Sequence, residues 1–323
     1  MNNYDSKFVP EPFGFNNLGA TCYFNALLQS IISCPSVTKI LVKNKDEEGY
    51  KDNLIVQYMV KMYNIMSDEK VEQQKKQSFF LNLAPMIWKA VFAKAMLRQD
   101  NVKFTPGQEC AREGFHLFLE ALDGLSEIQN LFLHRYQTLI FCPDCNAWVV
   151  NKECEYSLFE VQPTMITPQL VRFKDIDPFY NKKRTLEQFL KKQNSYVDNN
   201  FKCPKCGKKE SKFQTTRLLM IPEVLVVLSK KYDERGRRKS HDITPFPEKL
   251  TFEGKCCEET PDGNLMKYQA VSRIEHMGSM GGGHYNCHSI RKDGKWYHLD
   301  DSRVGPGSFT PTSNTYMVFY HII

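Results

Sequence analysis

Two Cys-x-x-Cys pairs constrain this chain most, because they must meet in space if they bind one metal ion. They are Cys142-Pro143-Asp144-Cys145 and Cys203-Pro204-Lys205-Cys206. Four thiolates in two such turns form the tetrahedral site of structural zinc, so one zinc ion per chain is expected at Cys142, Cys145, Cys203 and Cys206. Strand-like segments at 139–141 and 148–150 strengthen this assignment. Disulfides are the alternative, and the composition disfavours them because it is typical of intracellular proteins, whose thiols stay reduced.

A further cysteine stands where a loop becomes a helix. Apolar residues at 27, 28, 31 and 32 follow Cys22 at helical spacing and stop before Pro35, so a helix is expected to begin at or next to Cys22. Free backbone N–H groups and the helix dipole favour a thiolate there. Asn17, on the incoming loop, offers an amide that can donate to an oxyanion. Cys22 is therefore a candidate nucleophile, and a buried, unreactive thiol is the alternative.

The far end of the chain carries a candidate base. His284 follows a run of glycines, and residues 285–291 alternate as a strand does. Asp293-Gly294 predicts a hairpin turn, and the returning strand 295–299 ends at Asp300-Asp301. A hairpin lays its strands side by side, so Asp300 is expected to reach His284 and orient it as the base for a cysteine. Alternatively, His284 is an exposed strand residue and Asp300 a turn residue.

Together these segments resemble the Cys box and the His box of the ubiquitin-specific proteases, cysteine peptidases that release ubiquitin from conjugates. The segment that matches the Cys box is Gly14-Phe15-Asn16-Asn17-Leu18-Gly19-Ala20-Thr21-Cys22-Tyr23-Phe24-Asn25. The segments that match the His box are Gly282-Gly283-His284-Tyr285 and Trp296-Tyr297-His298-Leu299-Asp300-Asp301. The resemblance spans nearly the whole chain.

The resemblance implies a papain-like cysteine peptidase of the α+β class. Residues 12–323 would form a single catalytic domain after a short extension, 1–11. Within it, a thumb is expected at about 12–130, zinc-ribbon fingers at about 131–215 and a palm at about 216–323. The pattern of the residues agrees, because helical spacing dominates 22–130 and strand-like runs follow. The active site is expected in the cleft between the helical and sheet lobes.

The resemblance also implies an activity. It is that of a thiol-dependent deubiquitinase, which hydrolyses the isopeptide bond after the C-terminal glycine of ubiquitin. Cys22, His284 and Asp300 would form the catalytic triad, Asp301 would support it, and Asn17 would help to hold the oxyanion. The expected partners are ubiquitin and ubiquitinated proteins.

Substrate-binding residues follow from the same likeness. Gly283 and Tyr285 are expected to line a narrow channel for a Gly-Gly tail, with ordinary strand packing as the alternative for Tyr285. Glu113 is expected to face the basic tail of ubiquitin, with a solvated helix residue as its alternative. Cys110 stands where the family carries an aspartate, so one carboxylate is missing here.

Composition limits the location and the partners. The chain has 323 residues and a net charge of +6. Its start lacks a signal-peptide apolar run, and no stretch approaches the roughly twenty apolar residues of a membrane span. A cytosolic or nuclear enzyme with no membrane partner is therefore expected. The basic residues are scattered except around 230–239, so no nucleic-acid partner is expected. The oligomeric state stays open.

Three other functions stay open beside the deubiquitinase. A protease for another Gly-Gly-ended modifier would keep the chemistry and change the substrate. A ubiquitin-binding pseudoenzyme would keep the fold, but such proteins usually lose a triad residue, and Cys22, His284 and Asp300 are all present. A zinc-ribbon nucleic-acid module would explain the four paired cysteines and neither box.

Overall fold

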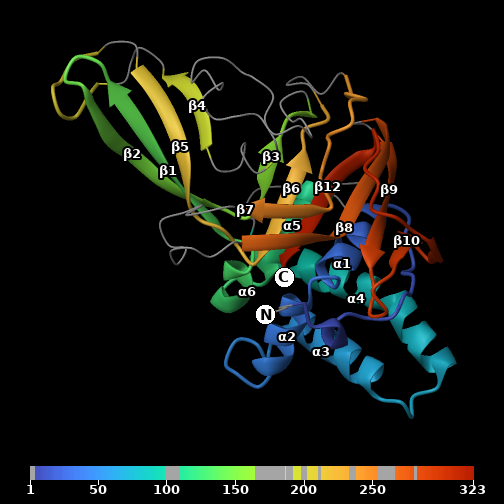
Figure 1. Ribbon diagram of the computed structural model, residues 1–323. Helices are drawn as coiled ribbons and strands as arrows, with labels where there is room; N and C mark the ends of the chain where they lie inside the picture. The colour runs from blue at the N-terminus through green and yellow to red at the C-terminus, as the bar shows by residue number, and fades with distance from the viewer. Residues whose placement is uncertain are drawn as a thin grey trace.

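The structure is a computed structural model, and it describes residues 4–98, 110–163, 186, 192–197, 202–209, 212–232, 238–252, 266–279 and 282–323. Helices come first along the chain and strands follow. The helices lie in the lower part of Figure 1, a broad sheet stands against them, and a narrower sheet projects to the upper left. This arrangement confirms the α+β class.

The helical part was expected from its apolar spacing. Its helices are the 3-10 helix η1 (Ser6–Phe8) and the α-helices α1 (Cys22–Ile31), α2 (Pro35–Lys43), α3 (Leu54–Ser67), α4 (Gln73–Arg98), α5 (Ala111–Ala121) and α6 (Ser126–Asn130). The prediction that a helix begins at Cys22 is confirmed. α4 begins at Gln73, so the polar segment 73–77 is already helical, and all of it except Lys76 is exposed.

The broad sheet is the palm, with strand order β11-β10-β9-β8-β12-β6-β3 and β7 paired to β8. Its strands are β3 (Phe159–Val161), β6 (Val224–Ser229), β7 (Lys249–Phe252), β8 (Met266–Ser279), β9 (Gly282–Ile290), β10 (Trp296–Asp300), β11 (Arg303–Pro306) and β12 (Thr315–Ile322). The predicted hairpin is confirmed, because β9 and β10 pair antiparallel and Gly294 takes the left-handed backbone of the turn, φ 76°.

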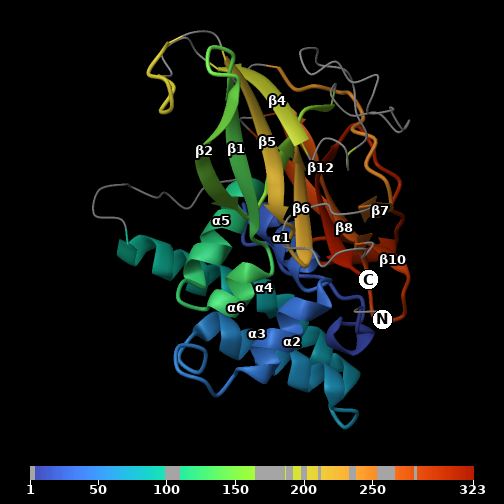
Figure 2. The ribbon, with the colours of Figure 1, turned by 60° about the vertical axis from the view of Figure 1, so that its left-hand side comes forward.

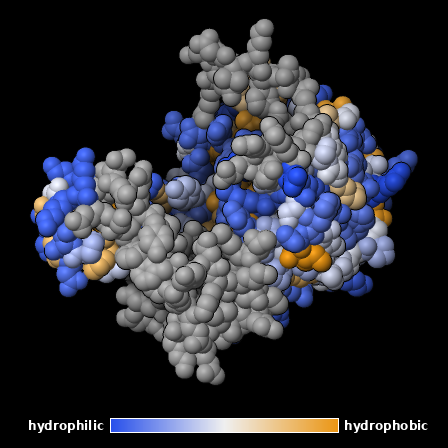
Figure 3. Space-filling view, turned by 90° about the horizontal axis from the view of Figure 1, so that it is seen from above, coloured by the Kyte–Doolittle hydropathy of each residue, from blue (hydrophilic) through white to orange (hydrophobic). Residues whose placement is uncertain are grey.

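The narrower sheet forms the fingers, with strand order β2-β1-β5-β4. Its strands are β1 (His134–Cys142), β2 (Ala147–Tyr156), β4 (Lys192–Val197) and β5 (Lys212–Met220). Figure 2 shows this sheet rising above the helices, and in the view from above it stands apart from the main body, at the left of Figure 3.

The sheets depart from the predicted fingers range of 131–215 at two points. β3 falls inside that range, but it belongs to the palm because it pairs with β6 in parallel register, Phe159 opposite Val227. β5 runs past the range to Met220, because it stays paired with β1 as far as Arg135. Strand partners so distant in the chain leave no local mark in the sequence.

α1 lies at the centre of the molecule, and all of its residues are buried. It packs against α4, α5, β8 and β9, and its residues share one hydrophobic cluster with Phe115 of α5, Ile274 of β8 and Phe319 of β12. Because both lobes hold α1, its N-terminal end has a fixed place relative to β9. That end carries Cys22.

α4 has the length and apolar composition of a helix that can cross a membrane. Core helices of water-soluble proteins commonly pass the same test. Here Leu83, Ile87 and Val91 lie in the main hydrophobic cluster, so the apolar residues of α4 are explained at least in part by packing against the rest of the chain.

Pro85 lies inside α4 and leaves one backbone carbonyl of the helix without its usual donor. Proline has no backbone N–H, so the carbonyl four residues earlier, that of Leu81, loses its helical donor. The N–H of Asn16 donates to that carbonyl instead, at 2.8 Å. α4 therefore anchors the loop that leads to Cys22.

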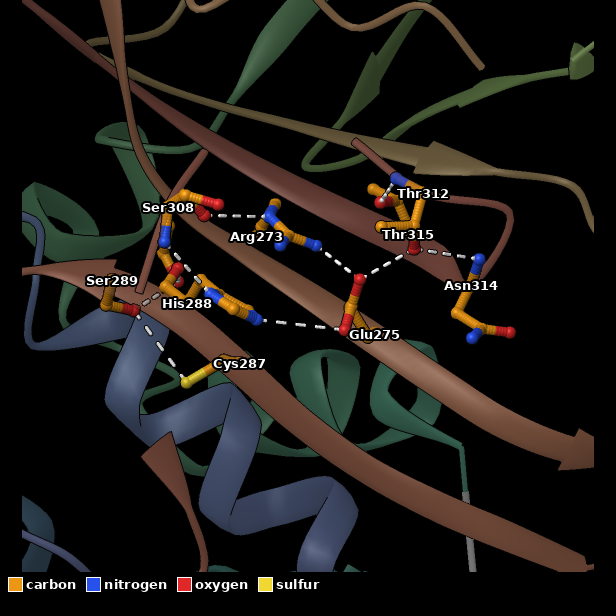
Figure 4. Close-up of polar contacts among 10 residues, drawn as sticks. Arg273, Glu275, Cys287, His288, Ser289, Ser308, Thr312, Asn314 and Thr315 are labelled. Carbon is orange, nitrogen blue, oxygen red and sulfur yellow. Dashed lines mark hydrogen bonds and ion pairs between the residues drawn. The ribbon is translucent and has the colours of Figure 1, made fainter. Parts of the chain in front are cut away.

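A buried polar network fastens the connection between β11 and β12 onto the palm (Figure 4). Arg273 Nε donates to the carbonyl of Ser308 at 3.1 Å, and the N–H of Ser308 donates to His288 Nδ1 at 3.2 Å. Thr312 Oγ1 donates to Glu275 at 2.7 Å, and Arg273 pairs with the same carboxylate. Burial alone would raise the pKa of Glu275, but Thr312 and Arg273 hold it below its ordinary value.

Candidate active site

Cys22 is the first residue of α1 and its side chain is nearly enclosed, with 4% exposed. Burial raises the pKa of its thiol above the ordinary value, and the Asp301 carboxylate raises it further. The backbone N–H groups of Tyr285 and Tyr23 act in the opposite direction. The backbone N–H groups at the start of α1 therefore favour the thiolate, as expected, but desolvation outweighs them.

His284 on β9 and Asp300 on β10 lie together, as the hairpin predicts. His284 Nε2 is hydrogen-bonded to the Asp300 carboxylate, and both side chains are partly exposed. Because Asp300 occupies Nε2, the nitrogen left for a reacting group is Nδ1. Tyr285, the next residue on β9, presents its N–H to Cys22, so base and thiol lie on adjoining elements.

Asp301 lies close to His284 and Asp300, and its hydrogen bonds are made to the loop that precedes α1 and to α1 itself. One carboxylate oxygen accepts from Asn17 Nδ2 at 2.9 Å, and the other accepts from Asn25 Nδ2 at 2.7 Å. The Asp301 carbonyl accepts from the N–H of Phe15 at 2.8 Å. The backbone of Asp301 is left-handed, φ 51°, a conformation that aspartate tolerates better than most residues. Asp301 thus joins the two ends of the chain.

Asn17 is held by both ends of its amide. Its oxygen accepts from the N–H groups of Gly19 at 2.8 Å and Thr21 at 3.1 Å, while its nitrogen donates to Asp301. Asn25, the second donor to Asp301, was not singled out from the sequence. The available signal was a polar residue on a helix whose neighbours are apolar, since such a residue must find partners inside the protein.

Gly14 lies where the same loop touches the turn after β10. A Cβ atom there would stand 2.5–2.6 Å from the backbone of Ser302, so only glycine allows this approach. A Cβ on Gly283 would likewise overlap His276 and the carbonyl of Met277. Packing therefore gives Gly283 a reason to be glycine besides the expected substrate channel.

Tyr285 is buried, with 4% exposed. Its ring stacks on His276, 4.4 Å between centroids, and meets Tyr316 edge to face at 5.9 Å. Burial lowers the pKa of His276 to about 4, so this histidine packs as a neutral ring. Tyr285 is thus fixed beside Cys22, with most of its ring turned into the protein.

Glu113 lies in the first turn of α5, and 48% of its side chain is exposed. Cys110 caps this helix, because its sulfur accepts from the N–H of Glu113 at 3.4 Å. The neighbouring Arg112 bonds Glu160 at 2.9 Å and approaches Glu113 at 3.4 Å. Where the family carries an aspartate, this helix therefore has a weak cap from the Cys110 sulfur. Arg112 is the cation next to Glu113.

Two hollows meet at Arg112 and Glu160. One, of about 870 Å³, is lined on its other sides by residues that include Lys239 and Tyr316. The other, of about 650 Å³, lies at the base of the fingers and includes His134. Arg112 and Glu160 thus line both hollows, and the larger one reaches Tyr316, which touches Tyr285.

The four paired cysteines lie together at the end of the fingers. Their sulfurs are all within 4.8 Å of one another, with 3.6 Å between Cys142 and Cys206 and 3.9 Å between Cys145 and Cys203. A tetrahedral zinc ion with Zn–S bonds of about 2.3 Å requires sulfurs about 3.8 Å apart. All four thiols are free, so the disulfide alternative finds no support, and the cluster can hold a metal ion.

Comparison with known proteins gives a consistent result. The family model described as ubiquitin carboxyl-terminal hydrolase matches residues 13–320. Ubiquitin carboxyl-terminal hydrolase 4 of Saccharomyces cerevisiae is 22% identical over 99% of this chain, which spans 40% of that relative's length. Ubiquitin carboxyl-terminal hydrolase 15 of Homo sapiens is 30% identical over 44% of this chain and 15% of its own length.

Solved structures share the fold. The SAGA DUB module bound to monoubiquitin contains a chain that this protein matches over its full length, with a TM-score of 0.69, 18% identity and 71% of that chain covered. The corresponding module bound to ubiquitin aldehyde gives the same TM-score, with 72% of its chain covered. The expected mixed helix and sheet fold is thus matched by solved deubiquitinase structures.

Proposed function

Because this chain belongs to the ubiquitin carboxyl-terminal hydrolase family, we propose that it hydrolyses the isopeptide bond after the C-terminal glycine of ubiquitin. The observation that carries the proposal is the His284–Asp300 hydrogen bond, made by the residue next to Tyr285, whose N–H faces Cys22. A cysteine needs an oriented imidazole to act as a nucleophile, and a family resemblance alone does not supply that alignment. The pseudoenzyme alternative has no such need of an intact base.

The reaction begins with the neutral thiol that burial favours. His284 takes the proton of Cys22 through Nδ1, and Asp300 stabilises the imidazolium that forms. The thiolate attacks the glycine carbonyl, and Asn17 with nearby backbone N–H groups holds the oxyanion. The lysine amine leaves with the proton from His284. Water, activated by the same imidazole, then hydrolyses the thioester.

The hollow of about 870 Å³ that reaches Tyr316 would receive the tail of ubiquitin. The hollow at the base of the fingers would receive its globular body. Gly283 and Tyr285 would border the tail near Cys22, and Glu113 would face its basic residues. The replacement of an acidic residue by Cys110 weakens the expected attraction for such a tail. A modifier with a less basic tail that also ends in Gly-Gly is therefore the second candidate substrate.

We assign one zinc ion to Cys142, Cys145, Cys203 and Cys206. It would hold the ends of β1 and β2 to the 203–206 turn, so its binding energy would stabilise the fingers. Reduced thiols at this site suit the cytosol or the nucleus, where we place the protein. The partners that follow are ubiquitin and ubiquitinated proteins.

One experiment tests the substrate. A ubiquitin probe with a C-terminal electrophile should label the wild-type protein at Cys22 and leave Cys22→Ala unlabelled. Parallel probes made from related modifiers compare the second candidate directly. Labelling by none of the probes, in protein shown to be folded, would refute a protease of this class.

A further inference from the structure

His284 stands on a narrow part of the palm sheet. The pairing of β8 with β12 ends at Glu275, and the pairing of β9 with β10 ends at Cys287. Beyond these points the two segments, 276–279 and 282–285, have only each other as strand partners among the residues the structure describes. A ribbon of two strands is at best marginally stable on its own. The base therefore needs support from outside this ribbon.

One lysine gives such support at the open edge of β8. The Nζ of Lys239 donates to the carbonyl of His276 at 2.5 Å and to the carbonyl of Gly278 at 3.2 Å. Backbone groups alternate between the two edges of a strand, so the residue between these two, Met277, faces β9, where its partner is His284. The ammonium thus holds the strand on both sides of the residue that pairs with the base.

The segment that carries Lys239 is tied to the ribbon by a second side chain. Lys239 forms a β-bridge with Tyr232, and the Tyr232 hydroxyl lies 3.1 Å from His276 Nδ1. The Lys239 ammonium lies 3.4 Å from the same nitrogen. An ammonium can only donate, so Nδ1 accepts and Nε2 of this histidine carries the hydrogen. Lys239 is therefore held where it can keep both carbonyls.

The charge of Lys239 is used on carbonyls and not on a carboxylate. Within the described part of the chain it forms no ion pair, and burial lowers the pKa of its amine below the ordinary value. Partial burial of an ammonium costs free energy that charge-assisted hydrogen bonds can offset. The two carbonyls at the edge of β8 supply those bonds.

We propose that Lys239 is a positioning residue for the base, acting through the edge of β8 on His284. The inference rests on the proposed function, in which His284 takes the proton of Cys22. Lys239 also lines the hollow that would receive the tail. A change at Lys239 can therefore act on tail binding as well, so the test has to separate the two effects.

Lys239→Met removes the donor and keeps an unbranched side chain. On a fluorogenic ubiquitin substrate kcat should fall about 10-fold, because a displaced base loses part of the roughly 10²- to 10⁴-fold that general base catalysis contributes. KM should change less than about threefold. Backbone amides at 282–285 should exchange with solvent faster than in wild type, while those of β10 keep their rates. A melting curve checks that the variant is folded.

Alkylation of Cys22 by iodoacetamide supplies the discriminating readout, because it involves no tail. Near neutral pH the thiol is protonated, since burial raises its pKa, so the rate depends on the base. Lys239→Met should slow alkylation by about the same factor as kcat. In the His284→Ala background it should change the rate less than about twofold, because a residue that acts through the base has no effect once the base is gone. Mass spectrometry assigns the modified cysteine.

Lys267→Met is the matched control. Lys267 is exposed toward the other end of β8, so the same chemical change there should leave kcat, exchange and alkylation as in wild type. An unchanged kcat for Lys239→Met, a loss confined to KM, or equal slowing of alkylation with and without His284 would overturn the positioning role. Failure of wild type on ubiquitin would refute the proposed function instead, and the alkylation series, which needs no modifier, still decides the role of Lys239.

Discussion

Adding one methyl group at Gly14 should disable catalysis more than folding. The new Cβ atom would lie 2.5–2.6 Å from backbone atoms of Ser302, whereas ordinary contacts begin at 3.4 Å. Neither partner is a flexible side chain, so the loop and the turn must separate by about 0.9 Å. Such overpacking typically costs about 1–3 kcal/mol of stability.

The same displacement acts on the active site. The loop carries Asn17, and the turn carries Asp301 and follows Asp300, so a shift near 1 Å falls on the contacts between them. Misplacement of this size can cost about 100-fold in rate. We therefore expect Gly14→Ala to remain folded at 25 °C and to lose about 100-fold in kcat on a fluorogenic ubiquitin substrate, with the unfolding midpoint measured in parallel.

Gly305→Ala is the control for this prediction. It makes the same chemical change on β11, where the new Cβ atom would meet nothing within 4 Å, and it should behave as wild type. If Gly14→Ala loses stability but keeps a kcat within twofold of wild type, the close approach of loop and turn does not align the site, and the reasoning is refuted.

Four further predictions follow from other parts of the structure. Metal analysis should find one zinc ion per chain in the wild type and none in Cys203→Ser, whose melting temperature should be lower; folded, active wild-type protein without zinc would contradict the assignment. Pro85→Ala should stabilise α4 by up to about 3 kcal/mol yet lower kcat, because the restored N–H competes with Asn16 for the Leu81 carbonyl. If stability and kcat both rise, α4 does not anchor the loop that leads to Cys22. Since burial raises the pKa of Cys22, its alkylation rate in the free protein should still be rising above pH 9.0, and a plateau near pH 7 would show a preformed ion pair instead. Glu113→Ala should raise KM for ubiquitin substrates by an amount equivalent to about 1–3 kcal/mol, and unchanged KM would place tail recognition elsewhere.

Features written in local patterns could be predicted from the sequence. The start of α1 at Cys22 follows from apolar spacing that ends at a proline. The β9–β10 hairpin follows from turn chemistry at Asp293-Gly294 and alternation on both sides. The four cysteines lie close together, as expected because one tetrahedral metal ion requires four ligands. The catalytic roles themselves stay predictions until the variants are measured.

Features that depend on distant neighbours could not be predicted. Desolvation of Cys22 depends on how closely β9 covers the start of α1, and no residue near Cys22 encodes that. The bonds from Asn17 and Asn25 to Asp301 join positions far apart in the chain. The same applies to β3, whose three residues look like part of the fingers and whose partner lies in the palm. In each case a long-range contact decided the outcome over the local pattern.

The strand order of the palm has a consequence for biosynthesis. β12 lies between β8 and β6 at the middle of the sheet, although it follows both in the chain. A nascent chain that has emerged only as far as β11 therefore has a sheet open at its centre, and its helical lobe lacks Phe319, which packs on Phe115 of α5. Such long-range pairing is slow and leaves apolar edges exposed to aggregation. Cys22 and His284 would thus take their final places relative to each other only after β12 leaves the ribosome.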